Sequence, residues 1–198
     1  MNLAELLSLA IFVILAENVV LVQLLGVRPM LDASGKMGAA LGTGITVTVV
    51  MGLASLCTWA VNTYLLIPLG VDRFLNTLVF ILIIALLVYL VKLFLKHVIA
   101  SLYTALVSSL PLIATNCAVL GAVLLNTQQG YGALMSVACG VFGGLGFTLA
   151  AVLLTSVRER LEFSECPKAF EGFPIALVTA GLLAMAFMGF SGLCLPLD

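Results

Sequence analysis

Six long apolar stretches fill the chain and constrain its fold more than any other feature. They cover about residues 3–27, 37–60, 74–95, 101–125, 132–157 and 173–193. A helix needs about 20 mostly apolar residues to cross a hydrocarbon layer about 30 Å thick, so each stretch is long enough to span a membrane. The sequence therefore predicts an all-α integral membrane protein, with six transmembrane helices in a single domain over residues 1–198.

The composition excludes most other classes of protein. Hydrophobic residues make up 63% of the chain and charged residues only 9%, whereas a soluble domain is about 25% charged. This excludes a soluble enzyme and a disordered tail. Eight Lys and Arg residues against nine Asp and Glu leave no basic face for phosphates, so lipid and not nucleic acid is the expected partner. The first five residues contain no Lys or Arg, so we expect no cleaved signal peptide.

The basic residues predict the orientation of the spans. Seven of the eight Lys and Arg residues lie on one side of a six-span chain, and Arg73 alone lies on the other. The seven are Arg28, Lys36, Lys92, Lys96, Arg158, Arg160 and Lys168. Basic residues concentrate on the cytoplasmic side of membrane proteins, so both termini are expected outside a bacterial or archaeal cytoplasmic (inner) membrane.

The chain also contains a weak internal repeat. Glu17-Asn18 interrupts the first apolar stretch, and Thr115-Asn116 interrupts the fourth, 98 positions later. Gly42 and Gly44 in the second stretch resemble the glycine pair at 144 and 146 in the fifth, 102 positions later. Each half, about 1–97 and 98–198, holds three spans, so the two halves must be inverted relative to each other.

An inverted repeat of this kind predicts breaks in its first helices. We expect an interruption near residues 18–26 in the first span and near 115–121 in the fourth, where Pro111 precedes it. Non-helical backbone at membrane depth lines a cavity or is buried in protein. Polar groups at such breaks are candidates for an ion path, and here they are Glu17, Asn18 and Asn116.

Cys117 is the candidate metal ligand among five cysteines, because it directly follows the second predicted break. A thiolate there is a plausible iron–sulfur ligand, although the other ligands of a cluster must come from elsewhere in the chain or from a partner. No pair of cysteines has CxxC spacing, and Cys57 and Cys139 are expected to be packing residues.

Four segments of the chain resemble the A-type subunit of the Rnf complex. They read NVVLVQLLG at 18–26, LPLIATNCAVLG at 110–121, VRERL at 157–161 and IALVTAGL at 175–182. The resemblance covers essentially the whole chain. A sister family is the E-type subunit of the sodium-pumping NADH:quinone reductase, and the AVLG form at 118–121 is more similar to the Rnf version.

The resemblance implies a membrane subunit of an ion-translocating ferredoxin:NAD oxidoreductase, coupled to Na⁺ or H⁺ movement. It implies as partners the other Rnf subunits, of types B, C, D, E and G, and above all the homologous E-type subunit. The pair would share a [2Fe-2S] cluster with two cysteines from each, one of which maps onto Cys117. No flavin or NAD would bind this chain, and no complete active site lies in it.

The chain departs from that family pattern at two positions. The second family cysteine lies in a Gly-x-Cys-Pro motif, where this chain reads Gly26-Val27-Arg28-Pro29. Arg28 cannot supply a thiolate. Lys92 stands in the third span, where related chains often carry an acid.

Three other functions stay open from the sequence. The chain could be the E-type subunit of the NADH:quinone reductase. It could be a stand-alone secondary transporter that binds a solute near Glu17 and Asn116, or a component that only scaffolds its neighbours.

Overall fold

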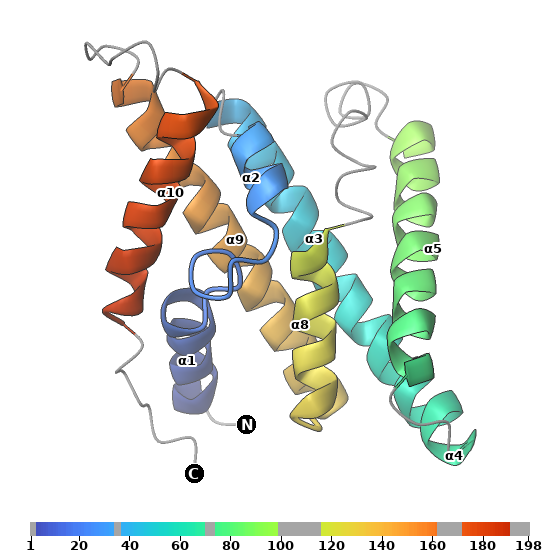
Figure 1. The fold of residues 1–198 in the computed structure, drawn as a ribbon. Coiled ribbons are helices and arrows are strands. Elements are labelled where there is room, and N and C mark those ends of the chain that lie inside the picture. Colours follow the sequence, from blue (N-terminus) through green and yellow to red (C-terminus); the bar gives the residue numbers. More distant parts are fainter. Residues whose placement is uncertain (1–2, 34–36, 70–73, 99–115, 162–171, 191–198) are drawn as a thin grey trace.

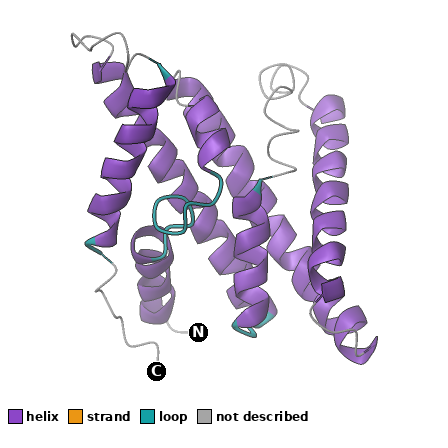
Figure 2. Ribbon diagram, viewed as in Figure 1, coloured by secondary structure: helices purple, strands orange, loops and turns teal. Residues whose placement is uncertain are grey.

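The computed structural model describes residues 3–33, 37–69, 74–98, 116–161 and 172–190, and the regular elements in these ranges are all helices (Figure 2). The all-α prediction is confirmed for this part of the chain. In chain order the elements are α1 (Leu3–Ile11), the π-helix η1 (Phe12–Ala16), α2 (Val27–Ala33), α3 (Met37–Val61), the π-helix η2 (Asn62–Leu66), α4 (Ile67–Leu69), α5 (Phe74–Val98), α8 (Cys117–Gln128), α9 (Ala133–Leu161) and α10 (Phe173–Met188).

Among the described residues, two helices are long and apolar enough to cross a membrane by themselves, Met37–Leu66 and Ala133–Leu161. They correspond to the second and fifth predicted spans, and the first of them continues beyond its predicted end at Ala60. Shorter apolar helices lie within the other four predicted spans, over Leu6–Ala16, Thr77–Leu93, Cys117–Gln128 and Phe173–Met188. Most of the first half of the fourth span lies outside the described residues.

The first predicted interruption is present. The helix formed by α1 and η1 ends at Ala16, and the chain is not helical again until α2 begins at Val27. At the second predicted interruption, Asn116 is extended and α8 begins at Cys117. This helix runs without a break through Gly121, so the predicted interruption extended five residues too far on that side. Thr115 and Pro111 lie outside the described ranges.

Helices α3 and α9 cross as the central pair of the fold, and small residues bring them together. A Cβ atom at Gly44 would lie 2.6 Å from the Thr148 side chain, and one at Gly144 would collide with Thr48. The hydroxyl groups of Thr48 and Thr148 lie 3.4 Å apart. Close approach through glycine, with hydroxyl groups hydrogen bonding across the interface, is typical of membrane helices.

These contacts are reciprocal, and they correct the register of the predicted repeat. Gly44 meets Thr148 and Gly144 meets Thr48, so positions correspond at a separation of 100 residues. The glycine pairs in the sequence had suggested 102. The crossing of α3 and α9 therefore has a local pseudo-two-fold axis near the two threonine hydroxyls.

Helix α3 has one buried face and one exposed face. Val47, Val50 and Met51 are fully buried, and they pack in one cluster with Phe147 and Leu154 of α9. Another face of α3 exposes large apolar side chains, namely Leu41, Ile45, Val49, Leu53 and Leu56. A helix that is apolar all round is typical of a membrane segment.

The first break lies at mid-height in the molecule, in front of α9 and between α1 and α2 (Figure 1). The beginning of α1, the turn between α8 and α9, and α4 lie at one end of the molecule. Helix α2 and the beginning of α10 lie toward the opposite end. Helix α10 packs against α9 and η1, while α5 and α8 pack together beside α3.

Candidate functional site

Asn18 organises the first break, which comprises residues 17–26. Its Oδ1 accepts hydrogen bonds from the backbone N–H groups of Val20 and Leu21, at 3.0 and 3.1 Å. Its Nδ2 donates to the carbonyl oxygens of Ile14 and Gly146, at 2.9 and 3.0 Å. The side chain is completely buried, and buried amides are stable only when bonded in this way. Asn18 therefore satisfies backbone groups that the break frees, and fastens the break to α9.

The end of the first break requires a glycine. Gly26 has a φ of +76°, which favours glycine over residues with a side chain. A Cβ atom here would also lie 2.6 Å from Asn116 Oδ1 and 2.8 Å from the Cβ of Ala118. The first break can therefore reach the beginning of α8 only because residue 26 has no side chain.

Cys117 lies where the first break meets α8. It is the first residue of the helix, and the N–H of Gly26 donates to its Sγ at 3.0 Å. The thiol is exposed. The preceding residue, Asn116, caps the helix through Oδ1, which accepts from the N–H of Ala118 at 2.9 Å. The structure thus joins the two sequence-predicted sites, the end of the first break and Cys117, through one N–H···S hydrogen bond.

Asn116 differs from Asn18 in one respect. It is 4% exposed, and its Nδ2 is buried without a hydrogen-bond partner among the described residues. A buried donor left unbonded costs free energy, so it calls for a specific explanation. Asn18 and Asn116 were predicted as ion-path candidates, and the structure gives both a role in fixing backbone at the ends of helices.

Arg28 is the second residue of α2, two positions after Gly26, and it is exposed. The positive charge of Arg28 therefore lies close in sequence to Gly26, which contacts Cys117. Within the described ranges, no group of three or more His, Cys, Asp or Glu residues gathers. Cys117 is thus available as a single thiolate, and this part of the chain does not complete a metal site alone.

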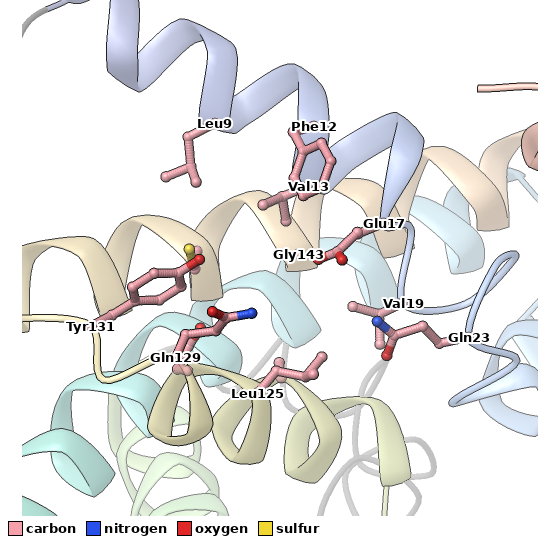
Figure 3. A pocket seen from close by; sticks show the side chains of 13 residues that line it. Leu9, Phe12, Val13, Glu17, Val19, Gln23, Leu125, Gln129, Tyr131 and Gly143 are labelled. Carbon is pink, nitrogen blue, oxygen red and sulfur yellow. The ribbon is translucent and has the colours of Figure 1, made fainter. Parts of the chain in front are cut away.

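Glu17, the remaining candidate, lines a cavity of about 50 Å³ between η1, α8 and α9. Figure 3 shows Leu9 and Val13 on one side of this cavity and Leu125 and Gln129 on the other, with Tyr131 and Glu17 toward its two ends. The polar lining residues are Glu17, Gln23, Asn126, Gln129, Tyr131 and Cys139. Within the part of the chain that the structure describes, the Glu17 carboxylate has no ion pair or hydrogen bond.

Four of these polar residues were not among the site residues predicted from the sequence. Gln23 lies in the first break, and Asn126, Gln129 and Tyr131 lie at the end of α8 and in the turn to α9. Burial raises the pKa of the Tyr131 phenol, and the neighbouring Cys139 and Glu17 raise it further. Tyr131 is therefore protonated at neutral pH and presents a hydroxyl group to the cavity.

The comparison with known proteins identifies the family. Residues 6–194 match the family described as Rnf-Nqr subunit, membrane protein. The chain belongs to the Rnf-Nqr family. This Rnf-Nqr chain is 51% identical over 193 residues to the A-type subunit of the Na⁺-translocating ferredoxin:NAD⁺ oxidoreductase complex of Acetobacterium woodii, with 98% of each chain covered.

Two further relatives of this Rnf-Nqr chain are named as A-type subunits of an ion-translocating oxidoreductase complex. The protein from Syntrophotalea carbinolica is 49% identical over 189 residues, covering 96% of this chain and 97% of its own. The protein from Edwardsiella ictaluri is 46% identical over 191 residues, covering 96% and 98% respectively. The family resemblance drawn from the sequence is therefore confirmed.

Proposed function

We propose that this chain is the A-type subunit of an ion-translocating ferredoxin:NAD⁺ oxidoreductase of the Rnf type. The family match over residues 6–194 supports this proposal, as do full-length relatives that carry that name. The chain thus acts as one component of a translocase, and it takes part in electron transfer coupled to ion movement.

The contact between Gly26 and Cys117 is the structural observation on which the proposal chiefly rests. An exposed thiol stands at the start of a helix, where two non-helical segments meet, and it accepts an N–H hydrogen bond. Hydrogen bonds to the sulfur ligands of an iron–sulfur centre are one of the means by which a protein sets its reduction potential. The arrangement suits a thiolate that carries an electron-transfer centre where two subunits meet.

The cofactor we propose there is a [2Fe-2S] cluster shared with the homologous E-type subunit. Cys117 would be the ligand from this chain, and the cluster would carry single electrons across the interface. Gly26 would donate a hydrogen bond to the ligand sulfur. Arg28, in place of the family's second cysteine, leaves that ligand to be supplied by another residue or by the partner. Its positive charge near a cluster would favour the reduced state and raise the potential.

The membrane arrangement we propose has six spans in two inverted halves, with both termini outside the cytoplasmic membrane. The reciprocal contacts between α3 and α9 support an inverted repeat. The beginning of α1, the turn between α8 and α9, and α4 lie at one end of the molecule, as six spans require (Figure 1). The subunits of types B, C, D, E and G would complete the complex.

The ion path we propose includes Glu17. An acidic side chain within a membrane helix marks an ion or proton path more often than it serves packing alone. Here it lines a cavity instead of pairing with a basic group in the described part of the chain. Asn18 and Asn116 would contribute by holding the two non-helical segments in place.

A purification through an affinity tag on this chain tests the proposal. The tagged chain should bring down flavin-carrying and iron–sulfur subunits, and the purified complex should reduce NAD⁺ with reduced ferredoxin. A chain that purifies alone and transports a solute after reconstitution would contradict the proposal and favour a stand-alone transporter.

A further inference from the structure

The Glu17 cavity, defined by Glu17, Gln23, Gln129 and Tyr131, has a larger neighbour. This second cavity, which we call the Ser55 cavity, has a volume of about 220 Å³ and lies between η2, α8 and α9. A water molecule needs about 10–15 Å³ of such space, so both cavities are large enough to hold water. Each cavity is also bordered by a π-helix, because Phe12 of η1 lines the first and Asn62 of η2 lines the second.

The Ser55 cavity has a mostly apolar lining with several hydroxyl and amide groups, and none of the described residues that line it is charged. Its hydroxyl and amide groups belong to Ser55, Thr58, Asn62, Thr63, Thr127 and Ser136. Neutral oxygen atoms of this kind replace part of the hydration shell of a cation without holding it tightly. An ion could therefore rest in this cavity without being trapped there.

Asn126 and Tyr131 line both cavities and so form the wall between them. Asn126 is held in place, because its Nδ2 donates to Ser55 Oγ at 3.3 Å and to the Ser136 carbonyl oxygen at 3.1 Å. The wall thus consists of one fixed amide and one phenol, and it separates a neutral compartment from a charged one.

The negative charge of Glu17 decides which kind of ligand the Glu17 cavity suits. Glu17 is the one formally charged residue among the described residues that line either cavity. Glu17 is exposed in the single chain. At the membrane depth where the proposed topology places the first break, a carboxylate needs a compensating charge, and one carboxylate balances one monovalent cation. The amide oxygens of Gln23 and Gln129 and the phenol oxygen of Tyr131 provide further neutral ligands. Such hard oxygen donors suit a cation that keeps part of its water shell.

We propose that the Ser55 cavity and the Glu17 cavity form a two-compartment entry for a monovalent cation, with Glu17 as the charged ligand. The inference deepens the proposed function, because it gives the ion-translocating role a binding site in this chain. The cation occupies the neutral compartment first, passes the wall of Asn126 and Tyr131, and is held beside the carboxylate. Both compartments lie beside the turn between α8 and α9, the end that the proposed topology places outside.

Cys139 provides a built-in test, because it lines the Glu17 cavity. Cys139 is only 7% exposed, so it reacts slowly, when thermal motion opens the cavity. In the purified complex, sodium should slow this alkylation by a small water-soluble thiol reagent further, measured by mass spectrometry of the modified peptide. Choline at the same ionic strength should not slow it. Glu17→Gln keeps the size of the side chain and removes its charge, so roughly tenfold more sodium or above should be needed for the same protection.

Glu159→Gln is the matched control, since Glu159 is an exposed acid near the opposite end of α9. It should leave the protection of Cys139 unchanged. Binding of radioactive sodium gives a second readout that does not depend on thiol reactivity: Glu17→Gln should lose one site per complex, and Glu159→Gln none. Equal sodium binding in the Glu17→Gln variant and the parent complex would overturn the inference.

The two proposals fail in different ways. If the parent complex does not reduce NAD⁺ with ferredoxin, the proposed function fails, and sodium binding still tests the cavity. If the parent complex is active and Glu17→Gln shows the same sodium dependence of NAD⁺ reduction, the function stands and the cation site is wrong.

Discussion

The two buried asparagines at the helix ends, Asn18 and Asn116, occupy similar places and are held very differently. Asn18 makes four hydrogen bonds, one of them to the Gly146 carbonyl oxygen on α9. Asn116 makes one, to the N–H of Ala118, and its Nδ2 has none. The first break is therefore fastened to the scaffold by its own amide. The beginning of α8 is capped by Asn116 and contacts Gly26, and the helix also packs against α3, α5 and α9.

The scaffold itself does not share this asymmetry. The Thr48 hydroxyl lies 2.8 Å from the Gly44 carbonyl oxygen, and the Thr148 hydroxyl 2.9 Å from that of Gly144. Each hydroxyl has one proton, so the one that donates across the interface gives up the bond to its own helix. Each glycine in turn receives the threonine of the other helix. Within the described residues, the asymmetry therefore lies at the helix ends that hold Asn18 and Asn116, next to the contact between Gly26 and Cys117.

Gly26→Ala should have the largest effect, because it disturbs both segments at once. The positive φ costs an alanine about 1–2 kcal/mol, and its Cβ would press on Asn116 and Ala118, which adds about 1–3 kcal/mol. We expect a loss of about 3 kcal/mol in the free energy of unfolding, measured by denaturant titration of the purified chain.

Gly181→Ala is the control for that substitution. Gly181 lies inside α10, and a Cβ there would meet nothing within 4 Å. Alanine should therefore stabilise the helix slightly, by about 0.5–1 kcal/mol. If Gly26→Ala were as well tolerated as Gly181→Ala, the close contact between the first break and α8 would be wrong.

Asn18→Leu and Asn116→Leu test the asymmetry directly, with smaller effects. Removing Asn18 leaves two backbone N–H groups and two carbonyl oxygens without their partner, which should cost about 2–3 kcal/mol. Removing Asn116 deletes one helix cap, which is worth about 1 kcal/mol. Its Nδ2 makes no hydrogen bond to the described residues, so the loss of that group adds little. Equal destabilisation in the same denaturant titration would show that Asn116 is bonded as fully as Asn18.

Substitutions of Thr48 and Thr148 should have the smallest effect on the free energy of unfolding, and the two single variants should lose similar amounts. Thr48→Val and Thr148→Val each remove one side of the contact between α3 and α9, and interhelical hydrogen bonds in membranes average about 0.6 kcal/mol. Each single variant should lose about that amount, and the double variant little more than either alone. Strictly additive losses would mean that the two hydroxyl groups do not interact.

The sequence predicted the scaffold better than the site. The all-α class and the first break followed from apolar length and from the polar residues within the first stretch. The two sequence pairs suggested repeat separations of 98 and 102 residues, on either side of the 100 that relates the contacts between α3 and α9. Helix α9 contains glycine at 140, 143, 144 and 146, so the pattern could not tell which of them faces α3. Only the reciprocal contacts with the threonines decide it.

The site depends on contacts between residues far apart in the chain. Cys117 could be singled out because it follows a predicted break. Its hydrogen bond to Gly26 spans 91 residues and depends on a positive φ that no periodicity reveals. Tyr131 and Glu17 likewise meet across a cavity formed by three separate elements. Glu17 itself was predictable, because a charge inside an apolar stretch is conspicuous.

The iron bound by the assembled complex, measured when Cys117 is changed, tests the proposed cluster site most directly. Cys117→Ser keeps a hydrogen-bond acceptor for Gly26 but removes the thiolate, while Cys57→Ala, in α3 and outside both cavities, serves as the control cysteine. We predict that Cys117→Ser loses about two iron atoms per complex, loses one [2Fe-2S] signal in electron paramagnetic resonance, and loses ferredoxin-dependent NAD⁺ reduction, with Cys57→Ala retaining all three. Full iron content, an unchanged signal and unchanged electron transfer in Cys117→Ser would show that Cys117 holds no cluster.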